Sequence, residues 1–111
     1  MVAARPKMDA RSLLDRMKAL LQVAFGERLR GVVLYGSEAR GEAEPDSDID
    51  LLVLLAGPID LGRDLRICIH ALYPLVLELE RPIDWLPVDV SAYEAGENPL
   101  FAKAKSEGIA A

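Results

Sequence analysis

Residues 32–55 read VVLYGSEARGEAEPDSDIDLLVLL and contain the clearest structural signal in the chain. An apolar run at residues 32–35, rich in β-branched side chains, stops at Gly36-Ser37, and a second apolar run follows a polar connection. This pattern predicts a strand over residues 32–35, a glycine turn, and a second strand over residues 48–55. Because the first run is apolar throughout, we expect that strand to be central and covered on both faces.

Asp48 and Asp50 lie at the entrance of the second predicted strand. Side chains alternate sides along a strand, so these two carboxylates point the same way. At about 5 Å separation and an effective dielectric constant of about 20, their charges repel by roughly 3 kcal/mol, which a divalent cation would offset. Carboxylate oxygens suit Mg²⁺ completed by phosphates and water, although acids at a strand entrance can also simply face solvent.

The Gly36-Ser37 turn is a second candidate feature, because residues 37–40 can form a short helix that begins at Ser37. A helix that starts directly after a strand leaves backbone N–H groups free beside the serine hydroxyl, and this arrangement suits a phosphate. Most such turns only redirect the chain. Neither established glycine-rich phosphate motif is present, so a phosphate site here would be of another type.

The remaining sequence predicts helices on both sides of this stretch and one more strand. Apolar spacing and capping residues predict a helix over residues 9–25, capped by Asp9 or Ser12, and a second helix over residues 60–80 with a bend or break at Pro74. Residues 83–88 predict a short third strand, in which Pro87 suits a sheet edge or the end of a strand. A helical turn over residues 91–94 and a last helix over residues 98–105 complete the predicted elements. No internal repeat interrupts this order.

Bulk composition narrows the possible functions. A chain of 111 residues that is 51% hydrophobic predicts one domain over residues 1–111, with residues 1–8 as a loose leader. The net charge of −5 argues against direct binding to nucleic acid. A single cysteine excludes an internal disulfide, and no segment has the apolar length of a signal peptide or membrane span. We therefore expect a cytoplasmic protein.

The combination of Gly36-Ser37, ten intervening residues and Asp48-x-Asp50 resembles the signature of the DNA polymerase beta-like nucleotidyltransferases. The phrase GSEARGEAEPDSDIDLLV and the tail NPLFAKAKSEGI are similar to the minimal nucleotidyltransferases (MNT proteins) encoded beside HEPN-domain partners. The resemblance covers nearly the whole chain. It implies an α/β (α+β) fold of the polymerase beta-like palm type, a small mixed sheet backed by helices on one side, with the active site at the strand rim.

The resemblance also implies roles for individual residues. Gly36 and Ser37 would hold the β- and γ-phosphates of ATP, with Arg40 helping to neutralise them. Asp48 and Asp50 would bind two Mg²⁺ ions, and a third carboxylate would complete the metal site.

Two residues compete for the position of the third carboxylate. Asp84 on the predicted third strand is our choice, and Asp89 is the nearby alternative. Their positions differ by an odd number, so their side chains face opposite sides of a strand and only one can join the pair. Lys103 and Lys105 are expected on solvent-exposed faces.

The function that the resemblance implies is transfer of a nucleoside monophosphate, AMP from ATP, to an acceptor hydroxyl. The acceptor would be a tyrosine of a HEPN-family toxin, and AMPylation of that toxin would make this chain the antitoxin. An alternative is a non-catalytic binding module that neutralises its partner by occlusion. Transfer to a small molecule is a third possibility, disfavoured because the chain is too short for an acceptor-binding domain. The base preference, the acceptor atom and the oligomeric state stay open.

Overall fold

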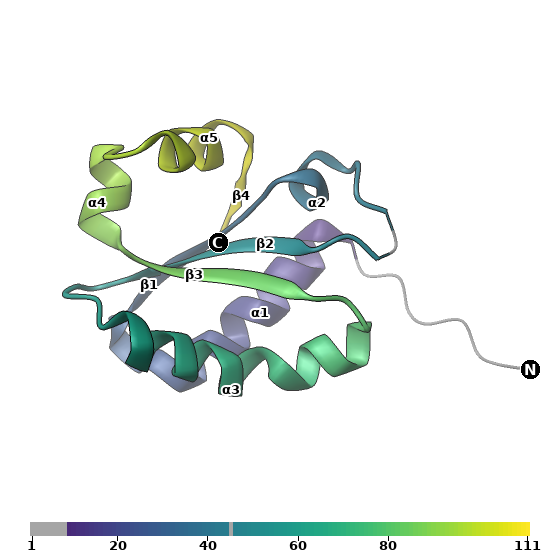
Figure 1. Cartoon of the computed structure of the whole chain (residues 1–111), viewed down its shortest axis with the longest axis horizontal. Coiled ribbons are helices and arrows are strands. Elements are labelled where there is room, and N and C mark those ends of the chain that lie inside the picture. The colour runs from purple at the N-terminus through teal and green to yellow at the C-terminus, as the bar shows by residue number, and fades with distance from the viewer. Residues whose placement is uncertain (1–8, 45) are drawn as a thin grey trace, which may run out of the picture.

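The computed structural model describes residues 9–44 and 46–111, so the expected leader at residues 1–8 lies outside the described residues. Helices and strands alternate along the chain (Figure 1). Their order is α1 (Ala10–Phe25), the 3-10 turn η1 (Gly26–Arg28), β1 (Leu29–Tyr35), α2 (Ser37–Arg40), β2 (Ile49–Leu55), α3 (Leu61–Leu79), β3 (Ile83–Asp89), α4 (Val90–Ala95), α5 (Pro99–Glu107) and β4 (Ile109–Ala110).

The strands form one mixed sheet in the order β3-β2-β1-β4. β1 runs antiparallel to both β2 and β4, whereas β2 and β3 are parallel and are joined through the long helix α3. Parallel neighbours need such a crossover because the chain must return to the starting end of the sheet. The predicted mixed α/β fold, the central position of β1 and the edge position of β3 are confirmed. The short strand β4 was not predicted.

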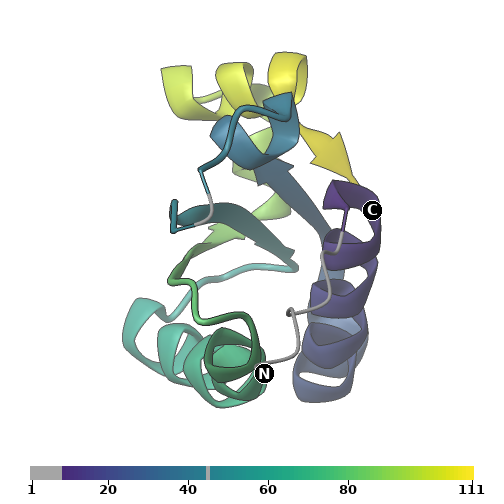
Figure 2. The same ribbon diagram turned by 90° about the vertical axis from the view of Figure 1, so that its right-hand side faces the viewer.

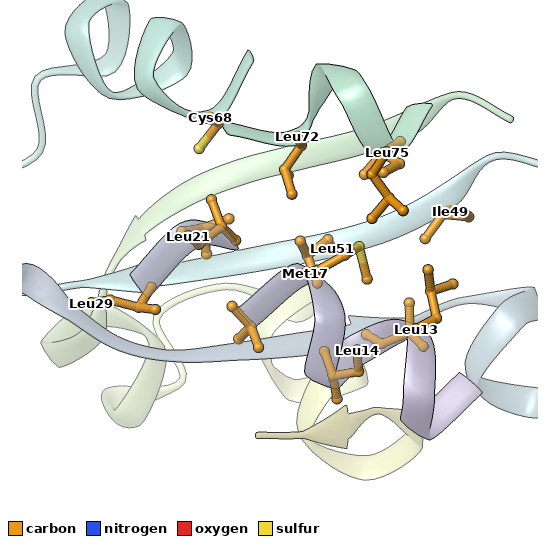
Figure 3. Packing of buried hydrophobic residues seen from close by; sticks show 14 of the residues in the cluster. Leu13, Leu14, Met17, Leu21, Leu29, Ile49, Leu51, Cys68, Leu72 and Leu75 are labelled. Carbon is orange, nitrogen blue, oxygen red and sulfur yellow. The ribbon is translucent and has the colours of Figure 1, made fainter. Parts of the chain in front are cut away.

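Helices α1 and α3 cover one face of the sheet, and their apolar sides form the larger core with β1 and β2 (Figures 2 and 3). The residues labelled in Figure 3 belong to this core: Leu13, Leu14, Met17, Leu21, Leu29, Ile49, Leu51, Cys68, Leu72 and Leu75. Alternate residues of the same strands point to the other face. The single cysteine is buried, as the sequence predicted.

The expectation that helices back the sheet on one side only was wrong. Helices α4 and α5 lie over the opposite face (Figure 1), where a second core joins the strands to the two helices. Its buried members are Val33, Leu52, Leu54, Val88, Tyr93, Phe101 and Ala104. The tail therefore shapes the face that carries the candidate site described below.

Side-chain caps begin most of the helices, largely as the sequence predicted. Asp9, Asp60 and Asn98 accept backbone N–H groups at the starts of α1, α3 and α5. The cap of α4 is Asp89, which accepts from the backbone N–H of Ser91. Helix α3 is not broken at Pro74. Pro74 is exposed, so the backbone carbonyl that loses its partner one turn earlier can bond to water.

A partly buried ion pair ties α3 to the η1 turn that precedes β1. Asp64 is fully buried and is the one buried charged residue in the described part of the chain. Arg28 donates to both of its carboxylate oxygens, at 2.8 and 3.2 Å, and the backbone N–H of Asp60 donates to it as well.

In the described ranges, no helix combines the length and hydrophobicity that crossing a bilayer requires.

Candidate active site

Tyr35, Asp50 and Asp84 form a row across three neighbouring strands. Tyr35 is the register partner of Asp50 on β2, and Asp50 is the register partner of Asp84 on β3. Directly paired residues of a sheet project from the same face, so the phenol and the two carboxylates stand side by side. Leu52 lies one step further along β2 on this face, within the core beneath α4 and α5. The row therefore lies at the end of a face that is otherwise packed.

Asp48 lies near this row, close enough for its charge to raise the pKa of Asp50, whereas Asp89 does not join it. Asp48 is exposed and immediately precedes β2, where the backbone N–H of Ile49 donates to Pro82 O at 3.0 Å. Asp89 is opposite Leu55, at the far end of the parallel pair, and caps α4. Of the two acids that the sequence left as alternatives, the structure places Asp84 beside Asp50.

Gly36 makes the turn between β1 and α2 with φ +76° and ψ −154°, a conformation that favours glycine. The space beside its Cα is filled by the carboxylate of Asp50, which a Cβ at residue 36 would overlap. The helix predicted to begin at Ser37 is present as α2. The glycine turn and the Asp50 carboxylate are therefore in direct contact, although 14 positions separate them in the sequence.

Arg40, at the end of α2, is held by two carboxylates. Its Nε donates to Glu42 at 3.1 Å and its Nη1 donates to Glu107 of α5 at 3.2 Å. Its charge, with that of Lys103 on α5, lowers the pKa of Asp50 against the effects that raise it. Both cations thus lie close enough to influence the carboxylate row. Lys103 is exposed, as the sequence led us to expect, but its closeness to Asp50 could not be read from a helical pattern alone.

Arg81 fixes the turn and the loop that precedes β2. Its Nη1 donates to Glu38 of α2 at 2.6 Å, and its Nε donates to the backbone carbonyl of Ser47 at 3.0 Å. The Arg81 and Glu38 side chains are only 15% and 14% exposed. Sequence analysis missed this residue, and no local pattern marks it, because its partners come from two other segments.

The row is electrostatically unfavourable without a cation. Burial raises the pKa of Asp50, and the charges of Asp84 and Asp48 raise it further. Burial also raises the pKa of the Tyr35 phenol, with Asp50 and Asp84 adding to the effect. Within the described ranges, no three His, Cys, Asp or Glu side chains lie close enough together to hold a metal ion by themselves. A cation here would need further ligands, such as phosphate oxygens and water.

Known proteins share this architecture. Residues 11–104 match the family model of the nucleotidyltransferase domain. A structure described as that of a minimal nucleotidyltransferase is 32% identical, with a TM-score of 0.55 over 92% of this chain and 95% of that chain. A crystal structure of a toxin–antitoxin with AMP-PNP is 21% identical, with a TM-score of 0.64 over 86% of this chain and 69% of that chain.

A third similar structure is that of the toxin–antitoxin MntA-HpeT, in a mutant with two aspartates, two positions apart, replaced by glutamate. It is 18% identical, with a TM-score of 0.61 over 86% of this chain and 69% of that chain. At these low identities, the two toxin–antitoxin likenesses establish the fold alone. Among curated proteins, none matches this sequence.

Proposed function

The chain belongs to the nucleotidyltransferase domain family, and from this premise we propose that it transfers AMP from ATP to an acceptor hydroxyl. The observation that carries the proposal is the pairing of Asp50 with Asp84 on adjacent strands, next to the Gly36-Ser37 turn. This places acidic groups and a phosphate-binding candidate at one end of the sheet. The same signature was recognised in the sequence as Gly36-Ser37 followed by Asp48-x-Asp50.

The donor set fits Mg²⁺ in its chemistry. Asp48, Asp50 and Asp84 supply carboxylate oxygens, and burial together with the charges of Asp84 and Asp48 raises the pKa of Asp50. Mg²⁺ is commonly held by one or two carboxylates together with substrate phosphates, so a compact cage of three side chains is not required. Two bound ions would stabilise the attacking and leaving oxygens of the displacement.

The side chains and backbone of the chain then have defined tasks. Gly36 allows the turn to approach the β- and γ-phosphates closely, and the Ser37 hydroxyl and the Arg40 guanidinium bind them. Asp84 accepts the proton of the acceptor hydroxyl. The acceptor oxygen forms a bond to the α-phosphorus, the bond from that phosphorus to the bridging oxygen of the β-phosphate breaks, and pyrophosphate leaves.

We propose a tyrosine hydroxyl of a HEPN-family toxin as the acceptor, which makes this chain an antitoxin. Support comes from the similar toxin–antitoxin structures, one with AMP-PNP and one with two altered aspartates in MntA-HpeT. Those aspartates have the spacing of Asp48 and Asp50 here.

Label transfer tests this proposal directly. The chain and its toxin partner are incubated with Mg²⁺ and with ATP labelled at the α-phosphate. We expect label on the toxin with the wild-type chain and none with Asp48→Ala. Absence of transfer by the wild type, or transfer that Asp48→Ala leaves unchanged, would contradict the proposal.

Neutralisation of the partner by occlusion, without catalysis, is the second candidate function. The two candidates differ in what the carboxylates must do. Occlusion predicts that Asp48→Asn and Asp50→Asn still neutralise the toxin, whereas enzymatic neutralisation predicts that both fail. Growth of cells expressing the toxin with each variant separates the two.

A further inference from the structure

Helix α5 lies beside the glycine turn, although 62 positions separate the starts of α2 and α5 in the sequence. Figure 2 shows α5 and α2 on the same side of the sheet, and the Arg40–Glu107 hydrogen bond of 3.2 Å joins them. Buried Phe101 and Ala104 fix α5 on the sheet. Lys103 and Glu107 are four positions apart and share one side of the helix. The side of α5 that carries Lys103 therefore borders the turn.

Lys103 is exposed and available to a ligand. None of the salt bridges found among residues 9–44 and 46–111 involves it. Lys105 differs, because it donates to the backbone carbonyl of Glu94 at 2.7 Å and lies over the Tyr93 ring. Of the two lysines, Lys105 supports the packing of α4 on α5. Lys103 contributes a positive charge that acts on Asp50.

A nucleoside triphosphate needs such a charge at this position. Its phosphates must approach the carboxylates of Asp48, Asp50 and Asp84. Like charges a few ångströms apart repel even in a partly solvated site. Arg40 is already paired with Glu42 and Glu107, which reduces its capacity to compensate the negative charge of the phosphates. A lysine ammonium acts as a compact point charge toward phosphate and needs no fixed geometry.

We propose that Lys103 is a phosphate-binding residue that contacts the β- and γ-phosphates of the nucleotide from the α5 side, with Arg40 beside it. The assignment rests on the proposed function and extends it. It makes the C-terminal helix part of the nucleotide site. Under this assignment Lys103 contributes to the binding of a nucleoside triphosphate and not to the binding of a nucleoside monophosphate.

Calorimetric titration of the full chain with ATP and with AMP, in the presence of Mg²⁺, tests the assignment without relying on transfer. We expect Lys103→Ala to weaken ATP binding at least about tenfold, as loss of a charge-assisted hydrogen bond does. AMP binding should change less than about twofold, and Lys103→Arg should retain most of the ATP affinity. Arg66→Ala, which removes an equal charge from α3 on the opposite face, is the matched control.

The outcomes separate this assignment from the proposed function. ATP affinity unchanged in Lys103→Ala, or reduced equally in Arg66→Ala, would overturn the Lys103 assignment alone. ATP binding that depends on Lys103 without any label transfer would support the assignment and overturn the proposed function. A wild-type chain that does not bind ATP would overturn both. Circular dichroism confirms that each variant is folded before titration.

Discussion

The carboxylate of Asp50 occupies the space beside Gly36 that any side chain at residue 36 would need. The glycine therefore serves two purposes, since its backbone also has φ +76°. A turn motif read from sequence explains the backbone conformation. The contact with Asp50 shows in addition that the turn and the metal-binding candidate fit together as one unit.

Gly36→Ala should greatly reduce the rate of transfer and should only moderately reduce the free energy of unfolding. We expect a loss of roughly 1–3 kcal/mol in the free energy of unfolding from backbone strain. Displacement of the Asp50 carboxylate should reduce the transfer rate about 100-fold, as misplacement by about 1 Å does elsewhere. Urea unfolding and label transfer measure the two effects. Gly41→Ala is the control, because Gly41 also has positive φ but no neighbour within 4 Å; equal activity losses would refute the argument.

Asp84 and Asp89 offer a matched pair on one strand. Asp84→Asn should lower the transfer rate at least about 100-fold, because it removes the carboxylate opposite Asp50. Asp89→Asn should leave the rate within about twofold, since asparagine also caps helices and Asp89 lies at the other end of β3. Steady-state rates of label transfer decide between them. A larger loss of rate in Asp89→Asn than in Asp84→Asn would show that Asp84 is not the third carboxylate.

Asp50→Asn should abolish transfer and yet stabilise the fold near neutral pH. Burial and the neighbouring acids raise the pKa of Asp50 above that of the unfolded chain. The wild type therefore loses stability as the pH rises from the ordinary aspartate range through the raised pKa. The variant lacks this loss, so its advantage in urea unfolding should be larger at pH 7 than at pH 3. A variant less stable than wild type at pH 7 would contradict the electrostatic account.

Asp64→Asn should have the opposite effect on stability. Hydrogen bonds from Arg28 lower the pKa of Asp64, so its contribution is present above the ordinary aspartate pKa and is lost as the pH falls through the lowered value. We expect a loss of about 3 kcal/mol at pH 7 from breaking a buried pair. The exposed Asp15, paired with Arg11 at 3.4 Å, provides the control, and Asp15→Asn should cost less than about 1 kcal/mol. Similar losses in the two variants would argue against a special role for burial.

Arg81→Ala should affect both the turn and the loop before β2. Removing its bonds to Glu38 and to the Ser47 carbonyl should cost about 2 kcal/mol of unfolding free energy. Hydrogen exchange measured by mass spectrometry should become faster in residues 37–48. If exchange in these residues stays as slow as in the wild type, Arg81 does not hold them.

Features determined by neighbours in the sequence could be predicted. The alternation at Asp48 and Asp50, the turn at Gly36 and the caps at Asp9 and Asp60 depend on a few adjacent residues, and the structure shows the corresponding elements. The parity argument also showed that only one of the two candidate acids, Asp84 and Asp89, can join the pair. Only the pairing of β2 with β3 decides which of them lies beside Asp50.

Features that depend on distant packing could not be predicted. Strand β4 is two residues long and exists because Ile109 meets the edge of β1 at Leu34. Asp64 sits in an ordinary helical pattern, and its burial follows from a partner 36 positions earlier. Lys103 likewise gains its place beside the turn because α5 packs on the face opposite α1 and α3.

The parallel pairing of β2 and β3 has a consequence for the order in which the protein folds. Asp50 and Asp84 become neighbours only after the whole crossover through α3 has closed, which is a slow, non-local step compared with formation of the antiparallel β1–β2 pair. A ribosome-bound chain that has emerged only as far as β2 thus still lacks Asp84, the register partner of Asp50. The paired carboxylates that the proposed transfer requires are therefore absent until β3 has joined the sheet.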